Sequence, residues 1–107
     1  MNSKLEDMIN WYVKLKQIPP AVSEYRFDKI RKWRFDFCYP EYKIACELEG
    51  GVWSMGRHTR GSGFIKDCEK YNSAVLQGWK ILRYTTSNIK DCINDINKLI
   101  DLTKDNK

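Results

Sequence analysis

The segment from residue 43 to residue 58, KIACELEGGVWSMGRH, constrains the fold of this chain most strongly. An apolar run leads directly into Glu47, Leu48 and Glu49, and two glycines follow. Alternate side chains of a strand point to the same face, so the two carboxylates are expected to lie together. Close carboxylates raise each other's pKa unless a positive group lies between them. The sequence therefore predicts a buried strand whose end requires a cation.

Hydrophobic periodicity and turn residues predict seven elements in the order helix, three strands, helix, strand, helix. The helices are expected over residues 3–16, 64–78 and 88–104, and the strands over 24–27, 32–39, 42–49 and 79–85. Ser3 and Ser87 are expected to cap the first and last helices, and Gly78 to close the middle one. Residues 50–63 hold five of the six glycines and are expected to form a loop.

A turn around Pro40 predicts that the second and third strands form a hairpin. The second strand alternates in polarity, which predicts Trp33, Phe35 and Phe37 on one face and Arg34, Asp36 and Cys38 on the other. Asp36 is then expected to approach Glu47 across the hairpin. The register of the two strands does not follow from the sequence.

With 107 residues the chain is expected to form one domain with one modest core, spanning 1–107. The formal charge of +5 and the isoelectric point of about 9.0 favour an anionic partner. No run approaches the ~20 apolar residues of a membrane span, and the first ten residues lack a signal-peptide core. We therefore expect a cytoplasmic protein, and the lysine- and asparagine-rich composition is typical of a bacterium or a phage-infected cell.

The four cysteines, at positions 38, 46, 68 and 92, form no CxxC pair and have irregular spacing. In a cytosolic chain this pattern predicts reduced thiols that pack as small hydrophobic side chains. A zinc site that combines some of them with His58 is the alternative.

Two or three carboxylates in one place suit a hard divalent cation. We expect Asp36, Glu47 and the backbone carbonyl of Leu48 to hold Mg²⁺, for which Mn²⁺ substitutes. The alternative is that the acids pair with Arg31, Arg34 or Lys43 on an exposed face of the sheet.

The acidic pattern, Asp36 followed after ten residues by Glu47-Leu48-Glu49, resembles the core of the PD-(D/E)XK nuclease superfamily. The resemblance implies a restriction-endonuclease-like αβββαβ core with a mixed sheet, to which this chain adds a C-terminal helix. In that superfamily an aspartate, a following acid and the carbonyl between them hold Mg²⁺, and a lysine two positions on helps to activate water. Glu49 stands here in place of that lysine.

The segments RKWRFDF, CELEGGVW, GRH, DCEKYNSA and GWKILRYT look like the Vsr-like branch of this superfamily, between Arg31 and Thr85. This branch includes the very-short-patch repair endonucleases and small phage and homing nucleases. The resemblance implies catalytic roles for Asp36, His58 and Asp67, and for Glu24 as an early acid.

Phosphodiester hydrolysis requires a metal or base that makes hydroxide and an acid for the leaving oxygen. Glu49 or His58 is expected to orient the water, and His58 equally to protonate the leaving group. Lys70 is expected to face the scissile phosphate, although Asp67 and Lys70 also suit a solvated helix pair. The expected DNA contacts are Arg31, Arg34, Arg57 and Arg60 on phosphates and Trp53 on a base.

These observations predict a small Mg²⁺-dependent endonuclease that nicks one strand, cuts branched substrates or acts as a homodimer, and the family resemblance alone implies that its substrate is DNA rather than RNA. A catalytically inactive nucleic-acid-binding module on the same fold is the alternative. A structural protein with a basic face is a third reading. Carboxylates beside phosphates argue against both alternatives unless a metal is present.

Overall fold

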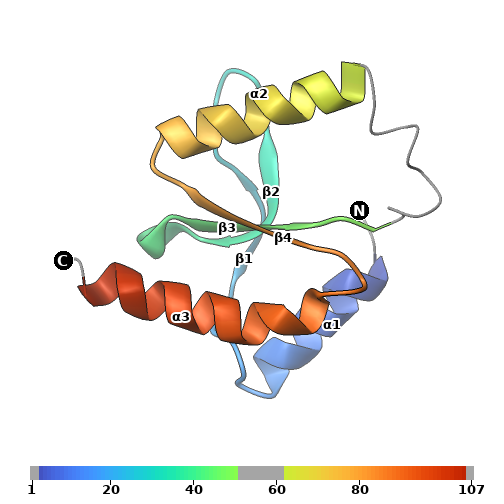
Figure 1. Ribbon diagram of the computed structural model, residues 1–107, viewed down its shortest axis with the longest axis vertical. Coiled ribbons are helices and arrows are strands. Elements are labelled where there is room, and N and C mark those ends of the chain that lie inside the picture. The colour runs from blue at the N-terminus through green and yellow to red at the C-terminus, as the bar shows by residue number, and fades with distance from the viewer. Residues whose placement is uncertain (1–2, 51–61, 106–107) are drawn as a thin grey trace.

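Within residues 3–50 and 62–105, which this computed structural model describes, helices and strands follow one another in the predicted order (Figure 1). The helices are α1 (Ser3–Lys14), α2 (Ser62–Leu76) and α3 (Cys92–Asp105), and the strands are β1 (Val22–Arg26), β2 (Arg34–Tyr39), β3 (Ile44–Leu48) and β4 (Lys80–Tyr84). Two short 3₁₀ turns, η1 (Pro40–Tyr42) and η3 (Ile89–Asp91), precede β3 and α3. The predicted order of elements is confirmed, with boundaries shifted by a few residues.

The four strands form one mixed sheet in the order β1-β2-β3-β4. β2 is antiparallel to both β1 and β3, and β4 runs parallel to β3. The parallel pair requires a crossover, which α2 provides. α2 covers one face of the sheet, and α1 and α3 cover the other (Figure 1). The predicted hairpin of β2 and β3 and the α/β class of the fold are confirmed.

Each face of the sheet has its own hydrophobic cluster. On the side of α1 and α3, helical spacing brings Leu5, Ile9 and Tyr12 of α1 against the sheet, together with Ile96 and Ile100 of α3. The cluster under α2 is smaller and consists of Phe35, Cys38, Ala45, Ala74 and Trp79. The sheet is therefore buried on both faces, which explains why all five residues of β3 are buried.

The alternation predicted along β2 is wrong. Phe35 belongs to the cluster under α2, whereas Phe37 belongs to the cluster under α1 and α3. The neighbouring strand reverses at the same point, because Glu24 has a positive φ of 52° and lies between the pairs Ser23↔Phe37 and Tyr25↔Phe35. At Glu24 and Asp36 the regular alternation of side chains between the two faces is therefore interrupted in both strands. Hydrophobic periodicity does not reveal this irregularity.

The ends of α1 and α2 have the same cap geometry. After α2, the N–H of Gly78 donates to the carbonyl of Val75 and that of Trp79 to the carbonyl of Ala74. Gly78 has the left-handed φ of 93° that this motif requires, which confirms its predicted role. Ser87 is not a helix cap, because it lies in a turn where its N–H donates to Oγ1 of Thr85.

All four cysteines are free thiols, and Cys38, Cys46 and Cys92 are buried as predicted. Cys68 corrects the prediction, since it lies exposed on α2. No helix in the described part of the chain is long and apolar enough to cross a membrane.

Candidate active site

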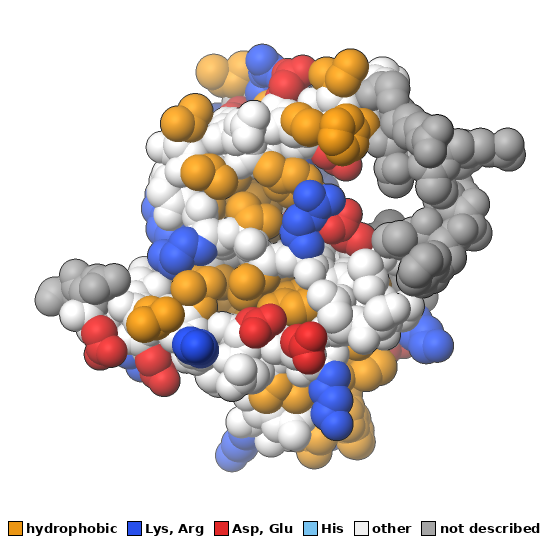
Figure 2. All heavy atoms as spheres, viewed as in Figure 1, with side chains coloured by type: hydrophobic (Ala, Val, Ile, Leu, Met, Phe, Trp, Pro, Cys, Tyr) orange, Lys and Arg blue, Asp and Glu red, His pale blue; other side chains and the backbone are white. Residues whose placement is uncertain are grey.

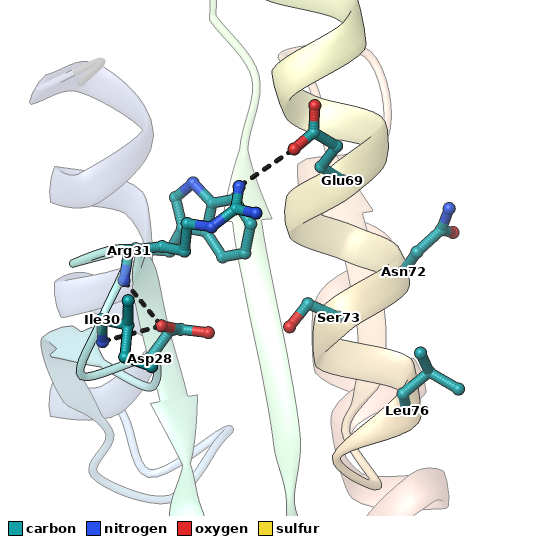
Figure 3. Close-up of a pocket in the computed structure, with 8 residues that line it drawn as sticks. Asp28, Ile30, Arg31, Glu69, Asn72, Ser73 and Leu76 are labelled. Atoms are coloured by element: carbon teal, nitrogen blue, oxygen red, sulfur yellow. Dashed lines mark hydrogen bonds and ion pairs between the residues drawn. The ribbon is translucent and has the colours of Figure 1, made fainter.

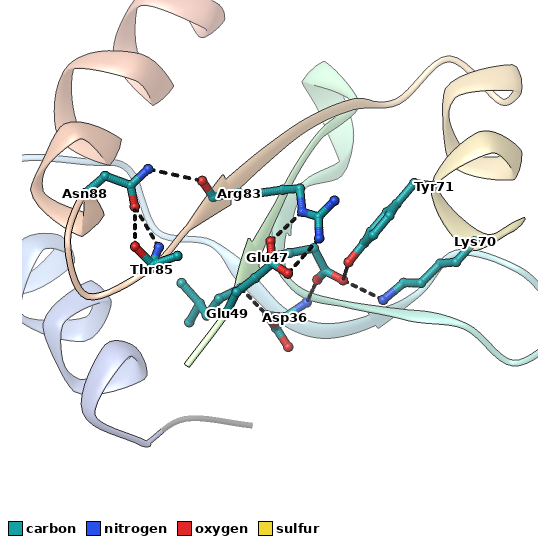
Figure 4. Close-up of polar contacts among 9 residues, drawn as sticks. Asp36, Glu47, Glu49, Lys70, Tyr71, Arg83, Thr85 and Asn88 are labelled. Carbon is teal, nitrogen blue, oxygen red and sulfur yellow. Dashed lines mark hydrogen bonds and ion pairs between the residues drawn. The ribbon is translucent and has the colours of Figure 1, made fainter. Parts of the chain in front are cut away.

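The hydrogen-bond ladder between β2 and β3 opens at Asp36 and Glu47 (Figure 4). Phe37↔Cys46 is the last regular pair at this end. Beyond it, the N–H of Asp36 donates to Oε2 of Glu47 at 2.8 Å, and the N–H of Leu48 donates to Oδ2 of Asp36 at 2.6 Å. Each of these backbone N–H groups therefore donates to a side-chain carboxylate of the other strand instead of to a backbone carbonyl. The expected approach of the two acids is confirmed.

Glu47 is a buried acid with a cation from another element. It is 5% exposed, and its Oε1 accepts from Nζ of Lys70 at 2.5 Å and from the hydroxyl of Tyr71 at 3.1 Å. Lys70 and Tyr71 reach it from α2 (Figure 4). Burial raises the pKa of Glu47, and the ion pair with Lys70 opposes this effect without cancelling it.

Glu49 has a different cation. Its two carboxylate oxygens accept from Nε and Nη2 of Arg83, which is the neighbouring charged residue on β4. The guanidinium carbon of Arg83 lies 4.6 Å from the centre of the Tyr71 ring. The two acids that follow the apolar run are therefore held apart by protein cations, although these are Lys70 and Arg83 rather than Arg31, Arg34 or Lys43.

Asp36 forms no ion pair within residues 3–50 and 62–105. Its pKa is raised chiefly by burial and also by nearby Glu24, while the Leu48 N–H and the charge of Lys70 lower it. In that part of the chain only Oδ2 of Asp36 has a hydrogen-bond partner. The side chain lines a small pocket of about 40 Å³ that it shares with Glu6 and Asn10 of α1. A pocket of this size holds about one water molecule or one small ion.

The donor set fits Mg²⁺ in part. Asp36 offers an oxygen beside a small pocket, and its raised pKa shows that too little positive charge offsets its burial. Both oxygens of Glu47, in contrast, already accept hydrogen bonds. No group of three His, Cys, Asp or Glu side chains among the described residues is arranged to hold a metal. Mg²⁺ nevertheless binds with one or two carboxylates, because it keeps several of its waters.

The other acids predicted for the site lie around this centre. Glu24 is exposed on β1 at the position opposite Asp36, and its charge raises the pKa of Asp36. Asp67 is exposed in the first half of α2, where it adds to the effect of Glu49 in raising the pKa of Arg83. His58, Trp53, Arg57 and Arg60 lie outside the described residues.

Arg31 and Arg34 lie away from the carboxylates. Nη1 of Arg31 lies 3.0 Å from Oε2 of Glu69, and the guanidinium carbon lies 5.1 Å from the centre of the Trp33 ring (Figure 3). Arg34 lies on β2 directly opposite Arg26 of β1, and both are exposed. The structure therefore places one predicted DNA contact in an ion pair and the other beside a like charge.

Sequence reasoning missed Tyr71, Arg83 and the pocket residue Glu6. Tyr71 follows Lys70 and lies four residues after Asp67, so a polar stripe on the inner face of α2 was a usable signal. Arg83 is the only charged residue between Lys80 and Thr85, and a lone charge within a predicted buried strand was also a usable signal for a site residue. Glu6 carries no such signal, because a single acid in the first turn of a helix is common.

Comparisons with protein-family models, with curated proteins and with solved structures found no match to this chain.

Proposed function

We propose that this chain is a metal-dependent endonuclease that hydrolyses phosphodiester bonds in DNA. The observation that carries the proposal is the state of Asp36. It is a partly buried carboxylate with a raised pKa, beside a small pocket and beside a second buried carboxylate, Glu47. Burying an acid in this way costs stability, and such costs concentrate where chemistry requires them.

The arrangement of strands supports a restriction-endonuclease-like assignment. The two acids lie on the second and third strands of an αβββαβ order, at the point where these strands separate. The third strand lies beside the parallel strand that follows the α2 crossover. Resemblance of the acidic pattern and the order of elements thus point to the same superfamily.

Lys70 compensates for the lysine that the acidic motif lacks. In the superfamily that the motif resembles, the lysine follows the second acid by two positions on the same strand. Glu49 occupies this position here, and the ammonium group reaches Glu47 from α2 instead. We propose that Glu47 would help to hold the metal, and that Lys70, which pairs with Glu47 in this structure, would then contact the scissile phosphate.

When bound, Mg²⁺ would polarise a phosphoryl oxygen and lower the pKa of a water molecule. Asp36, Glu47 and the Leu48 carbonyl are the groups proposed to hold it. Both carboxylate oxygens of Glu49 already accept hydrogen bonds from Arg83. We therefore propose that His58 moves the proton and that Glu49 fixes Arg83 for contact with a phosphate.

The strands β1 and β2 and their connection supply positive charge for the DNA backbone. Arg26 and Arg34 lie opposite each other across the two strands, and Lys29 and Lys32 lie in the connection between them. Like charges directly opposite one another destabilise a strand pair. A bound phosphate removes this repulsion, which supports an anionic partner on this side of the sheet.

The test is cleavage of labelled DNA as linear duplex, single strand and four-way junction, with Mg²⁺, Mn²⁺ or EDTA. We expect metal-dependent products from the wild type, and a loss of at least a hundredfold in rate for Asp36→Asn and Glu47→Gln. Asp101→Asn is the matched control, since this exposed acid lies on α3. Cleavage that persists in EDTA, or that survives Asp36→Asn, contradicts the proposal.

The inactive nucleic-acid-binding module remains the second candidate. The observation that favours it is the complete pairing of Glu47 with Lys70 and of Glu49 with Arg83, which a folded domain without catalysis also uses. Binding of every DNA substrate without cleavage under any of the metal conditions would establish this alternative.

A further inference from the structure

We infer that two copies of this chain associate through the outer face of α2. The surface, which we term the α2 outer patch, lies on the side of α2 that faces away from the sheet. Ile30 of the connection between β1 and β2 extends it, and on α2 it consists of Phe64, Ile65, Cys68, Asn72, Val75 and Leu76, of which only Asn72 is polar. Hydrophobic side chains gather over α2 in the space-filling view (Figure 2).

The spacing of the patch residues suits packing against another helix. Ile65, Cys68, Asn72 and Val75 follow one another at intervals of three, four and three residues, which is the spacing of a coiled-coil seam. The inner face of α2 buries only Ala74 completely. The inner face also carries the polar side chains of Lys70 and Tyr71, so most of the apolar side chains of α2 lie on its outer face, where they have no partner among the described residues.

A groove continues the patch beyond the helix (Figure 3). It has a volume of about 500 Å³ and lies between α2 and the connection from β1 to β2. Ile30 stands at one wall and Leu76 at the other, and these side chains are 89% and 87% exposed. In a two-fold dimer each surface meets its own copy, so Ile30 of one chain can enter the groove of the other in both directions.

The charged side chains that line the groove already have partners within the chain. Arg31 pairs with Glu69, and Oδ1 of Asp28 accepts from the N–H groups of Ile30 and Arg31. Among the residues that line the groove, Arg31 is therefore paired, whereas Lys29 and Lys32 flank Ile30 outside the groove. Salt screens the repulsion between the exposed lysines of two copies, so association at this surface should be strongest at high ionic strength.

The same contacts argue against a nucleic acid in the groove. A base would stack on Trp33, but Arg31 already lies over this ring and Phe27 stacks against it, with ring centres 6.2 Å apart. Arg31 itself is neutralised by Glu69. Among the described residues that line the groove, neither a free aromatic face nor an unpaired cation is present, and a nucleic-acid site of this kind uses both.

The exposed apolar area is close to that of a stable interface. Five large side chains, namely Ile30, Phe64, Ile65, Val75 and Leu76, are each more than half exposed. At on the order of 150–200 Å² for each side chain, they expose on the order of 600 Å². One partner contributes about 800 Å² to an interface of standard size, so the patch supplies most of this area.

Association at this surface leaves the candidate active site open. Lys70 and Tyr71 project from the inner face of α2 toward Glu47 (Figure 4), whereas the patch lies on the opposite side. The inference does not depend on the proposed nuclease function. If both hold, the dimer brings two sites to one DNA molecule.

Sedimentation equilibrium of the full reduced chain tests the inference, without DNA and in EDTA with 0.5 M salt. We expect the mass to rise from 12.7 kDa toward twice that value as the protein concentration increases. Leu76→Lys should weaken association at least tenfold, because it places a charge in the apolar surface that the partner copy covers. Leu102→Lys is the matched control, since Leu102 is an exposed leucine near the end of α3. Circular dichroism verifies that both variants are folded.

Cys68 provides an independent measurement, because it is the only exposed thiol of the four. A short bis-maleimide should join two wild-type chains through Cys68 and should join the Leu76→Lys variant far less. A mass of one chain at every concentration overturns the inference, and so does equal weakening by Leu102→Lys. A monomer in which Leu76→Lys reduces DNA binding would instead identify the patch as a nucleic-acid contact and would also overturn it. Absence of DNA cleavage bears only on the proposed function.

Discussion

The ammonium nitrogen of Lys70 lies 2.5 Å from Oε1 of Glu47, and this ion pair joins α2 to the end of β3. The side chain of Lys70 is 16% exposed and that of Glu47 is buried. Solvent therefore screens the pair weakly, and removal of one partner leaves the other charge uncompensated.

We expect Lys70→Met to lower the free energy of unfolding by about 3–5 kcal/mol at neutral pH. Urea unfolding measures this change. Lys66→Met on the exposed side of the same helix is the control, and it should change stability by less than about 0.5 kcal/mol. Equal effects of the two variants would show that the ion pair does not stabilise the fold.

The penalty of Lys70→Met should depend on pH. Burial raises the pKa of Glu47, so this carboxyl binds a proton more tightly in the folded state than in the unfolded state. Protonation removes the uncompensated charge, and the penalty should therefore shrink as the pH falls through the folded pKa. Urea unfolding between pH 7 and pH 4 measures it. Adding Glu47→Gln to Lys70→Met should recover stability at pH 7, whereas a constant penalty across this range would contradict the assignment.

Asp36→Asn should raise the melting temperature in EDTA at pH 7. Burial raises the pKa of Asp36, so its ionised form costs stability at neutral pH, and an asparagine oxygen can still accept from the Leu48 N–H. The gain should fade as the pH falls and the wild-type carboxyl protonates. Thermal melts that show a destabilised Asp36→Asn at pH 7 would contradict this expectation.

Mg²⁺ or Mn²⁺ should stabilise the wild type, because a ligand that binds only the folded state adds about 2.7 kcal/mol at a hundred times its dissociation constant. Thermal melts with increasing metal concentration measure this effect. Asp36→Asn should show no such increase, and Asp101→Asn should respond like the wild type. An equal metal response in both variants would remove Asp36 from the proposed metal site.

Lys16→Gly should stabilise the fold by about 0.5–1 kcal/mol. Lys16 follows α1 with a left-handed φ of 60°, and its N–H donates to the carbonyl of Val13 while that of Gln17 donates to the carbonyl of Tyr12. Glycine adopts this conformation without strain. The same substitution at Lys14, the last helical residue, should be destabilising instead. Urea unfolding of both variants measures the opposite signs.

One thiol in each folded chain should react rapidly with a disulfide reagent at pH 8. Burial raises the pKa of Cys38 and of Cys92 to about 12 and raises that of Cys46, whereas Cys68 is exposed. The reactive thiolate is therefore scarce at the three buried positions. Four thiols should react after denaturation, and Cys68→Ser should abolish the rapid phase. Two rapid thiols in the folded protein would contradict the burial of one of the others.

Local patterns were sufficient to predict the order of elements. The helical spacing of Leu5, Ile9 and Tyr12, and the glycine at position 78, depend only on neighbouring residues, because a helix and its cap are formed by contacts within a few positions. The alternation along β2 could not be predicted in the same way. It reverses at Asp36, where the side-chain bonds to β3 replace the regular ladder.

The sequence by itself determined that carboxylates would gather at the end of β3, because the spacing of Glu47 and Glu49 and a tight turn around Pro40 are local properties. Only the tertiary structure decided which cations accompany them. Lys70 and Arg83 lie 23 and 34 positions away from their acids, and the packing of α2 and the parallel register of β4 bring them close. Electrostatic partners at such separations depend on how the layers pack, and no periodicity along the chain encodes that distance.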